Sequence, residues 1–359
     1  MTTPLAEKLK RQIMQTGPIS ITEYMSACLF DPQLGYYTAQ EPFGRGGDFI
    51  TAPEISQMFG ELVAIWTAAA WQAAGSPKDF AFVEIGPGRG TLMADMLRTF
   101  RKSPTGFLDH ADVFMIETSP RLTGVQKAIL DSENDGLEWL QRFDDLPDLP
   151  AFVVANELFD AIPVRQYVKS GGVWRERVVG IDSDGNLVFA VGAGALDIDL
   201  LPDGAAGEPD GAIFEISPAR EALAESIACK IADHGGMALF FDYGHLQSAF
   251  GDTLQAVRNH EFDPVLSHPG QADLTSHVDF AALALAAEKA GASTSFLTQG
   301  EFLVRMGIVE RAGRLGANLD EDGRKQIAAD TERLAGADGM GEMFKAMAMF
   351  RPGMKPAPF

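Results

Sequence analysis

A glycine-rich turn in the first half of the chain is the segment whose residue types and spacing point most directly to chemistry. Residues 84–90 read EIGPGRG, between a short apolar run and a segment with helical spacing at 91–100. Gly86, Gly88 and Gly90 let the backbone turn sharply and approach a ligand with no side chain in the way. The helix that follows offers free N–H groups in its first turn.

The spacing and charge of this turn favour one class of ligand. A G-x-G-x-G spacing disfavours the pyrophosphate cradle of a dinucleotide, which uses G-x-G-x-x-G. Glu84, two residues before the first glycine, also disfavours a phosphate and can instead bind, through water, the ammonium group of a methionine moiety. We therefore expect S-adenosyl-L-methionine as the cofactor, with a nucleotide-dependent oxidoreductase on the same sheet as the runner-up.

Acidic residues follow the next two apolar runs. Glu117 ends the run at 113–116 and can accept hydrogen bonds from both ribose hydroxyls of an adenosine. The alternative for Glu117 is a strand-end carboxylate that faces solvent. Asp144 and Asp145 close the run at 137–143, where an acidic side chain can meet adenine, although at least one of them is expected to be a solvated loop carboxylate.

Short apolar runs alternate with helical segments along the middle of the chain. The expected strands cover residues 80–85, 113–116, 137–143, 152–155 and 237–241. This alternation predicts an α/β fold in which a parallel sheet is doubly wound, with helices on both faces, as in Rossmann-like folds. A helix at 279–290 and strands at 293–297 and 344–350 would form an antiparallel edge of that sheet.

Two regions lie outside this alternation. Residues 1–75 read as helices interrupted by a Gly/Pro-rich loop, and we expect this N-terminal helical region to contribute to the substrate cleft. Residues 76–359 then form the core, within which residues 163–211 are an inserted β-meander and loop. Helices are expected over residues 5–14, 21–29, 53–74 and 320–334.

Composition limits the partners and the compartment. The chain has 359 residues and a formal net charge of −21, and so acidic a surface repels phosphate backbones, which argues against nucleic acid as a partner. Cys28 and Cys229 lie far apart and lack neighbours at metal-ligand spacing, so no disulfide framework or metal site is indicated. No signal peptide and no membrane-inserting segment is recognised, and we expect a cytoplasmic protein.

Five stretches, taken together and in this order, resemble the MidA family of mitochondrial complex I assembly-factor methyltransferases and their bacterial relatives. They are residues 47–60 (GDFITAPEISQMFG), 84–90 (EIGPGRG), 156–163 (NELFDAIP), 241–244 (FDYG) and 273–280 (DLTSHVDF). The stretch at 251–260 departs from the family pattern, which leaves the role of that loop open.

The resemblance implies a class I methyltransferase fold with S-adenosyl-L-methionine as methyl donor. For the mitochondrial members it implies symmetric dimethylation of an arginine on a core subunit of NADH dehydrogenase. Because no transit peptide is recognised, this chain looks like a bacterial, cytoplasmic member. A bacterial relative can act on a different protein, so the substrate is left open.

An arginine substrate requires carboxylates in the site, because guanidinium is protonated and its lone pairs are delocalised. Carboxylates that bind the guanidinium fix its direction and localise its charge. Glu157 follows the fourth expected strand at the carboxyl edge of the sheet, so it is the first choice for this role. Asn156 would orient the substrate or the backbone. Asp160 would add a second carboxylate, unless it caps a helix or lies on the surface.

The segment before the long N-terminal helix is the expected lid or substrate contact. Asp48 and Glu54 flank Thr51, and Gly47 suits a hinge. Helix capping is the alternative for Thr51 and Glu54. His277 could line the pocket as a base, although proton removal after methylation is easy and demands no dedicated base.

Other functions fit parts of the pattern. A non-catalytic assembly factor or chaperone would keep the cofactor fold and use residues 156–157 only for partner binding. A small-molecule methyltransferase would use the same core. We expect a protein substrate because the helical region and the meander are large enough to build a cleft for a protein segment. The edge of the meander could also pair in a homodimer.

Overall fold

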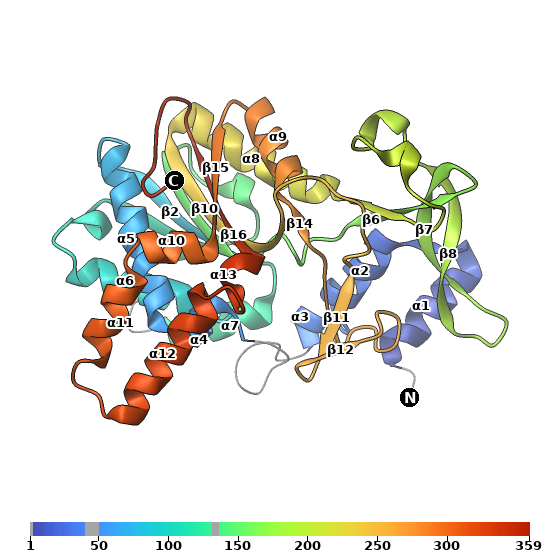
Figure 1. Ribbon diagram of the computed structural model, residues 1–359, viewed down its shortest axis with the longest axis horizontal. Helices are drawn as coiled ribbons and strands as arrows, with labels where there is room; N and C mark the ends of the chain where they lie inside the picture. Colours follow the sequence, from blue (N-terminus) through green and yellow to red (C-terminus); the bar gives the residue numbers. More distant parts are fainter. Residues whose placement is uncertain (1–2, 40–49, 131–135) are drawn as a thin grey trace. The chain divides into compact units, whose positions relative to one another are not determined.

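The computed structural model describes residues 3–39, 50–130 and 136–359 (Figure 1). Its elements divide into two compact units, each assembled from separate stretches of the chain. The first, here called the sheet unit, comprises Ile50–Leu158, Ala222–Gly244 and Leu283–Phe359. The second, here called the insertion unit, comprises Met1–Phe49, Phe159–Glu221 and His245–Ala282.

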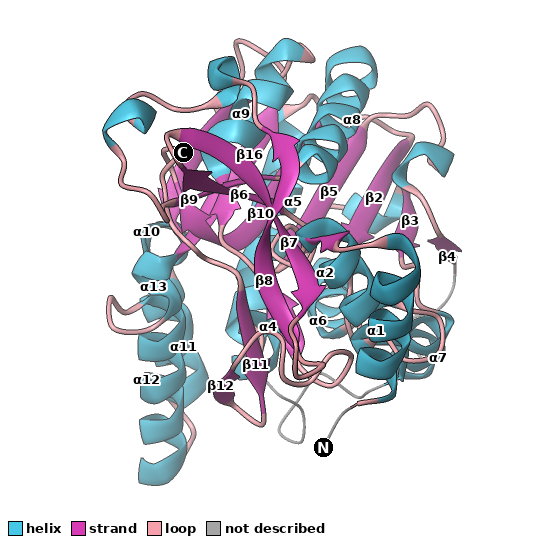
Figure 2. Cartoon of the chain, turned by 90° about the vertical axis from the view of Figure 1, so that its right-hand side faces the viewer, coloured by secondary structure: helices cyan, strands magenta, loops and turns pink. Residues whose placement is uncertain are grey.

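The sheet unit is built on a mixed sheet with the strand order β15-β16-β10-β5-β2-β3-β4. These strands are β2 (Phe80–Ile85), β3 (Ala111–Ile116), β4 (Leu137–Leu140), β5 (Ala151–Asn156), β10 (Gly236–His245), β15 (Ser293–Thr298) and β16 (Phe344–Phe350). Figure 2 shows β10, β5, β2, β3 and β4 following one another across the sheet. The predicted Rossmann-like fold is confirmed.

Of the seven strands in this order, β16 is reversed. Neighbours from β10 to β4 are parallel, whereas β16 runs antiparallel to both β10 and β15. The expected antiparallel edge therefore holds for β16 alone, because β15 runs in the same direction as the parallel strands. Four helices lie between β15 and β16 in the chain, so the two paired strands are not joined by a direct connection.

Both faces of the strands are buried, which explains why they read as continuous apolar runs. Phe82 and Phe152 point into the core that contains α5 and α6, and their neighbours Val83 and Val153 are equally buried on the other face. The helices of the sheet unit are α4 (Ala52–Ile55), α5 (Gln57–Ala73), α6 (Thr91–Lys102), α7 (Pro120–Ile129), α10 (Gln299–Arg305), α11 (Ile308–Gly316), α12 (Glu321–Ala335) and α13 (Met340–Met343). Helices α8 (Pro218–His234) and α9 (Phe280–Lys289) each begin in one unit and end in the other.

The long helix expected over residues 53–74 is interrupted at Ser56. This residue is extended, with φ −157° and ψ 140°, and separates α4 from α5. Its side chain accepts a hydrogen bond from the Met58 N–H at 3.4 Å and so caps α5. The sequence prediction missed this break because the apolar periodicity continues through it.

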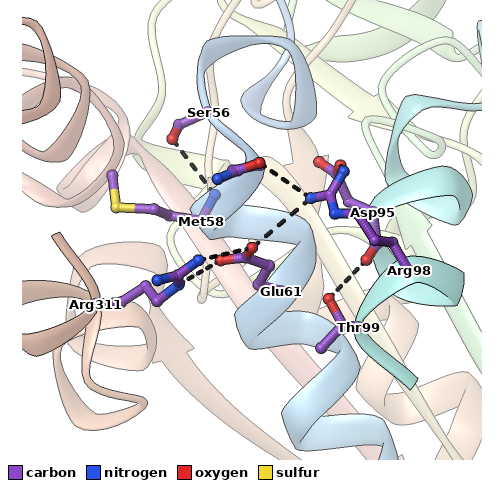
Figure 3. Close-up of polar contacts among 8 residues, drawn as sticks. Ser56, Met58, Glu61, Asp95, Arg98, Thr99 and Arg311 are labelled. Atoms are coloured by element: carbon purple, nitrogen blue, oxygen red, sulfur yellow. Dashed lines mark hydrogen bonds and ion pairs between the residues drawn. The ribbon is translucent and has the colours of Figure 1, made fainter. Parts of the chain in front are cut away.

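An ion-pair cluster joins α5, α6 and α11 (Figure 3). The guanidinium of Arg311 donates to both carboxylate oxygens of Glu61, at 2.6 and 3.0 Å. Arg98 lies on the other side of Glu61, at 3.7 Å, and pairs with Asp95 at 2.7 Å. Burial raises the pKa of Asp95 to about 6, although Arg98 opposes this shift.

The insertion unit combines helices with two smaller sheets. Its elements are α1 (Pro4–Thr16), α2 (Ile21–Phe30), α3 (Tyr36–Ala39), β1 (Ile19–Ser20), β6 (Arg165–Ser170), β7 (Val173–Ile181), β8 (Leu187–Ala195), β9 (Ile213–Ile216), β11 (Gln255–Arg258), β12 (Glu261–Asp263) and β13 (Asp273–Thr275). The expected meander is present as β6, β7 and β8, which pair antiparallel in order. Strand β1 adds to it by pairing with β7, which ties the N-terminal helices to the meander.

The loop after the meander is organised around a buried lysine. The Lys169 ammonium donates to the carbonyls of Ala205, Ala206 and Glu208 at 2.7 to 3.0 Å. The segment at 201–211, which reads as an unstructured Gly- and Pro-rich loop, therefore folds over a charged side chain that satisfies its carbonyl groups.

The two units divide the chain differently from the expected boundary at residue 75. Helices α4 and α5 group with the sheet, whereas residues 1–49 group with the meander and with residues 245–282. The cause is the pairing of β1 with β7, a long-range contact that no local pattern reveals. The contribution of the N-terminal region to a substrate cleft stays a prediction.

Candidate active site

The turn after β2 has a backbone that glycine adopts without strain. Gly86, Gly88 and Gly90 have φ values of 64°, 54° and 87°. The Gly86 N–H donates to the carbonyl of Ile116 at the end of β3, at 3.0 Å. A Cβ atom at Gly86 would lie 3.1 Å from Leu158 Cδ1, so space as well as conformation favours glycine. The three predicted cofactor-binding glycines thus form one turn at the carboxyl edge of the sheet.

Glu84 is a buried carboxyl at the start of this turn. Its side chain is only 3% exposed and accepts a hydrogen bond from the backbone of Met93, in the first turn of α6. Burial raises the pKa of Glu84 well above its usual range. Its Oε2 atom is buried and has no hydrogen-bond partner within the described residues. Such an atom fits a cationic or hydrogen-bonding group of a ligand.

Glu117 follows β3, and both of its carboxylate oxygens are held by donors. Oε1 accepts from the Ser119 N–H at 2.7 Å, and Oε2 accepts from Gln126 Nε2 at 2.9 Å. Burial raises the pKa of Glu117, and these hydrogen bonds oppose the shift. Each oxygen keeps a lone pair, so the fixed carboxylate can still accept from a pair of hydroxyl groups.

Gln126 is a polar residue of this site that the sequence prediction missed. It lies in α7, is completely buried, and donates also to the carbonyl of Gly88 at 2.9 Å. Its Oε1 accepts from the indole N–H of Trp139 in β4 at 3.0 Å. The signal available in the sequence was a glutamine on the apolar side of a helix directly after Glu117.

Asp144 lies on the surface after β4. Its side chain is 60% exposed and accepts hydrogen bonds from Ser226 Oγ at 2.8 Å and from the Arg142 guanidinium at 3.1 Å. These two bonds, that from Ser226 first, lower the pKa of Asp144. The surroundings fit the alternative of a solvated carboxylate, and a contact between Asp144 and adenine stays a prediction.

Asn156 and Glu157 form a hydrogen-bonded pair at the end of β5. Asn156 Nδ2 donates to Glu157 Oε1 at 2.9 Å, and Asn156 Oδ1 is buried without a hydrogen-bond partner in the part of the chain that is described. Glu157 has a φ of 53°, which residues other than glycine rarely adopt. Its N–H donates to the carbonyl of Phe241 at 2.8 Å. A strained residue held by its neighbours is typical of a functional site.

A buried aspartate on the neighbouring strand supports this pair. Asp242 in β10 is completely buried and accepts from the N–H groups of Leu158 at 3.2 Å and of Tyr243 at 3.0 Å. It thereby fixes the backbone directly after Glu157. The sequence prediction quoted residues 241–244 as a family motif but assigned Asp242 no role.

Asp160 and His277 belong to the insertion unit, and both are tied to the buried Arg220. The Arg220 guanidinium donates to the carbonyl of Asp160 at 3.0 Å and to that of His277 at 2.7 Å. Asp160 is 5% exposed, which rules out the surface position considered for it. The His277 N–H donates to Thr253 Oγ1 at 2.9 Å. Their roles toward a substrate stay predictions.

Of the expected lid residues that the structure describes, Glu54 contacts the glycine turn. Its Oε1 lies 3.7 Å from Arg89 Nη1, and its side chain is 11% exposed. Thr51 stands at the N-cap position of α4 but makes no side-chain capping hydrogen bond, so capping is not its observed role. Gly47 and Asp48 lie outside the described residues.

The geometry fits a ligand that joins an amino-acid cation to a nucleoside. The turn offers a buried carboxyl oxygen at Glu84, close backbone approach at the glycines, and a fixed double acceptor at Glu117. Across residues 3–39, 50–130 and 136–359, no group of three or more His, Cys, Asp or Glu side chains could hold a metal ion. Within the same ranges, no helix has the length and apolar character required to cross a membrane.

Sequence comparisons connect the chain to proteins of known type. A family described as S-adenosyl-L-methionine-dependent methyltransferases matches residues 62–298. A relative from Xenopus tropicalis, named protein arginine methyltransferase NDUFAF7, mitochondrial, is 36% identical across 93% of this chain and 83% of its own length. Its human counterpart of the same name is 35% identical across 97% of this chain and 83% of its own length.

Solved structures connect the chain to the same type of protein. A protein from Burkholderia thailandensis, described as a methyl transferase and crystallised with S-adenosyl-homocysteine, is 29% identical. It covers 97% of this chain and 92% of its own, with a TM-score of 0.80. A native crystal structure of a protein from the same organism gives a TM-score of 0.79. The expected cytoplasmic location is contradicted, because the curated relatives are mitochondrial proteins.

Proposed function

Because the chain belongs to this family of S-adenosyl-L-methionine-dependent methyltransferases, we propose that it methylates an arginine side chain of a protein substrate. The family resemblance, the cofactor and the class of enzyme expected from the sequence are confirmed. The proposal that the acceptor is arginine draws support from the relatives that are named protein arginine methyltransferases.

The observation that carries the proposal is the Asn156–Glu157 pair at the end of β5. Its carboxylate is oriented by an amide at 2.9 Å and stands on a backbone that Phe241 and Asp242 hold in place. The pair adjoins the glycine turn, because Leu158 lies against Gly86. A carboxylate beside the methyl donor is the group that a guanidinium substrate requires.

The cofactor contacts follow from the same geometry. Glu84 is placed to accept from the ammonium group of the methionine moiety, directly or through water, and Glu117 to accept from the ribose hydroxyls. When bound, S-adenosyl-L-methionine supplies an electrophilic methyl carbon on a sulfonium leaving group. Glu54 forms an ion pair with Arg89 of the glycine turn, at 3.7 Å.

The chain's contribution to the transfer step is alignment and charge. Glu157 accepts N–H bonds from the guanidinium, which draws positive charge toward the bound nitrogens and leaves the remaining nitrogen more nucleophilic. Asn156 holds the carboxylate in one orientation, so this nitrogen is directed along one line of attack. The proton released after methylation can pass to Glu157 or to water, so His277 is not needed as a base.

A core subunit of NADH dehydrogenase is the proposed substrate protein, on the ground of the resemblance to the MidA family. A chain with a net charge of −21 suits a cationic segment that displays an arginine. Complex I assembly would then be the process that the methylation serves.

The test is methyl transfer from labelled S-adenosyl-L-methionine to that purified core subunit of NADH dehydrogenase, followed by mass spectrometry of the modified residue. We expect methylated arginine with the wild-type protein and none with Glu157→Gln. Glu138→Gln, an exposed glutamate in β4, is the matched control and should retain activity. Calorimetric titration should show that Glu157→Gln binds S-adenosyl-L-methionine nearly as well as the wild type.

The outcomes separate the alternatives. Transfer to a residue other than arginine would contradict the acceptor, and full activity of Glu157→Gln would remove that residue from the guanidinium site. Cofactor binding without transfer to any protein substrate would favour a non-catalytic assembly factor. Transfer only to small amines would favour a small-molecule methyltransferase.

A further inference from the structure

The inner side of α7 carries an amide where an apolar side chain would be expected. Gln126 is completely buried, although glutamine is mostly exposed in folded proteins. The helix packs against the glycine turn at this residue, because a Cβ atom at Gly90 would lie 3.6 Å from Gln126 Cγ and 3.7 Å from its Cα. The amide therefore reaches the turn from the side of the sheet that carries Glu117.

Every hydrogen-bonding group of this amide is used, and its orientation is unambiguous. Nε2 donates one hydrogen to the carbonyl of Gly88 and the other to Glu117 Oε2, each at 2.9 Å. Oε1 accepts from Trp139 Nε1 at 3.0 Å. Because an indole nitrogen only donates, the amide oxygen must face Trp139 and the amino group must face the two acceptors.

The consequence is that one side chain determines two parts of the cofactor site. Glu117 has one oxygen on the Ser119 N–H and the other on Gln126, so the carboxylate cannot rotate about its own axis. The same amino group also binds the Gly88 carbonyl and so ties the turn to α7. A hydrogen bond to an ionised carboxylate is stronger than one between neutral groups.

We propose that Gln126 is a positioning residue: it orients the Glu117 carboxylate toward the ribose and locks the glycine turn to α7, so that both are ready before the cofactor binds. The proposal rests on the ribose role of Glu117. Trp139 completes the arrangement by fixing the direction of the amide.

A double-mutant cycle tests it, with calorimetric titration of S-adenosyl-homocysteine as the readout. Gln126→Met keeps the shape of the side chain and removes its polar atoms. We expect it to weaken binding about tenfold in the wild-type background, since a hydrogen bond to a charged group is lost. In the Glu117→Ala background the same substitution should change affinity by about twofold or less, because its main target is gone.

Gln299→Met is the matched control. Gln299 is equally buried in the same unit, and its amide donates to the Leu334 carbonyl at 2.8 Å in another helix. Gln299→Met should lower the midpoint temperature of thermal unfolding and leave the affinity for S-adenosyl-homocysteine unchanged. If Gln126→Met has the same effect in both Glu117 backgrounds, or no effect in either, the positioning role is wrong. If Glu117→Ala alone leaves affinity unchanged, it is the ribose assignment that fails.

Two further variants test the positioning role independently, in case Gln126→Met does not fold. Trp139→Phe keeps an aromatic ring but removes the indole N–H, and it should weaken binding about threefold through the freed amide, again only when Glu117 is present. Gln126→Glu places a carboxyl against Glu117 and the Gly88 carbonyl. Its affinity relative to the wild type should recover as the pH falls, because a shared proton restores the donor. A ratio that does not vary with pH would indicate a merely structural role.

Discussion

Glu157 combines a reactive side chain with a strained backbone, and substitution can separate the two. Its φ of 53° costs a non-glycine residue roughly 1–2 kcal/mol. Glu157→Gly should therefore abolish methyl transfer. The free energy of unfolding in urea should stay unchanged or rise slightly, because the relief of backbone strain is partly offset by the greater entropy that glycine loses on folding.

Ser76→Gly is the control for that prediction. Ser76 has a φ of 52° at an exposed position of the same unit, so the substitution should affect stability similarly and leave activity intact. A marked loss of stability in Glu157→Gly alone would show that the carboxylate serves the fold rather than the reaction.

Glu84 should make cofactor binding depend on pH. Burial raises the pKa of Glu84 in the free protein, whereas pairing with an ammonium group requires the ionised form. Binding must then release a proton, so affinity for S-adenosyl-L-methionine should increase with pH through the range in which the Glu84 carboxyl of the free protein ionises. Glu117, whose pKa is also raised by burial, contributes in the same direction.

The measurement is titration calorimetry in buffers of different ionisation enthalpy, which counts the protons released. Glu84→Gln should bind more weakly and show a flatter pH dependence, with Glu117 providing the remainder. An unchanged slope in Glu84→Gln would exclude Glu84 as the group that pairs with the ammonium.

Helices α5 and α6 lie close together at Gly60. A Cβ atom at Gly60 would lie 2.6 Å from the Cβ of Asp95, too close without movement of a helix. Gly60→Ala should therefore lower the free energy of unfolding by about 1–3 kcal/mol through overpacking. Gly124→Ala in α7, where nothing lies within 4 Å, should be neutral or stabilising by up to about 1 kcal/mol. Equal effects of the two substitutions in urea denaturation would contradict this packing argument.

The protein should become less stable as the buried Asp95 carboxyl of the ion-pair cluster ionises. The pKa of Asp95 is about 6 in the folded protein, above the usual aspartate value of 3.8. Between these values the folded protein binds more protons than the unfolded chain, so the contribution of Asp95 to stability falls as the pH rises. Relative to Asp95→Asn, the wild type should lose about 1 kcal/mol between pH 5 and pH 7. Urea unfolding at both pH values measures the difference, and parallel profiles would contradict it.

Elements defined by local patterns could be predicted from the sequence, whereas those defined by tertiary contacts could not. The strand over 80–85 was predicted residue for residue, because it is buried on both faces and ends at a glycine. The break at Ser56 interrupts a continuous apolar pattern, and the helices α10 and α11 follow one. The ends of these helices therefore depend on tertiary packing and not on a local pattern. By the same distinction Glu84, near the end of β2, and Glu117, directly after β3, could be named from the strand pattern. The role of Gln126 comes from its contacts with Gly88, Glu117 and Trp139, which no local pattern specifies.

At the scale of the whole molecule, each unit is assembled from segments that lie far apart in the sequence. Ile19 and Ser20 pair with Val179 and Val178, so the first helices and the meander share one core. A boundary drawn at residue 75 from composition cannot detect such pairing, because nothing local marks the partner of a two-residue strand.

The outer strand of the meander leads to a prediction about assembly. Strand β8 pairs with β7 along one edge, and no strand of the described residues pairs with its other edge. Its nine residues, LVFAVGAGA, contain no charge and no proline, the features that usually protect an edge strand. Antiparallel pairing of β8 with the same strand of a second copy would give a symmetric dimer.

Sedimentation velocity should therefore show a dimer for the wild type and a monomer for Val191→Lys, because Val191 is half-exposed in β8 and a lysine there opposes its symmetry mate. Val173→Lys is the matched control, since Val173 is similarly exposed but lies in the inner strand β7, and it should remain a dimer. A wild-type protein that sediments as a monomer at tens of micromolar, or a dimer that survives Val191→Lys, would show that this edge is not the interface.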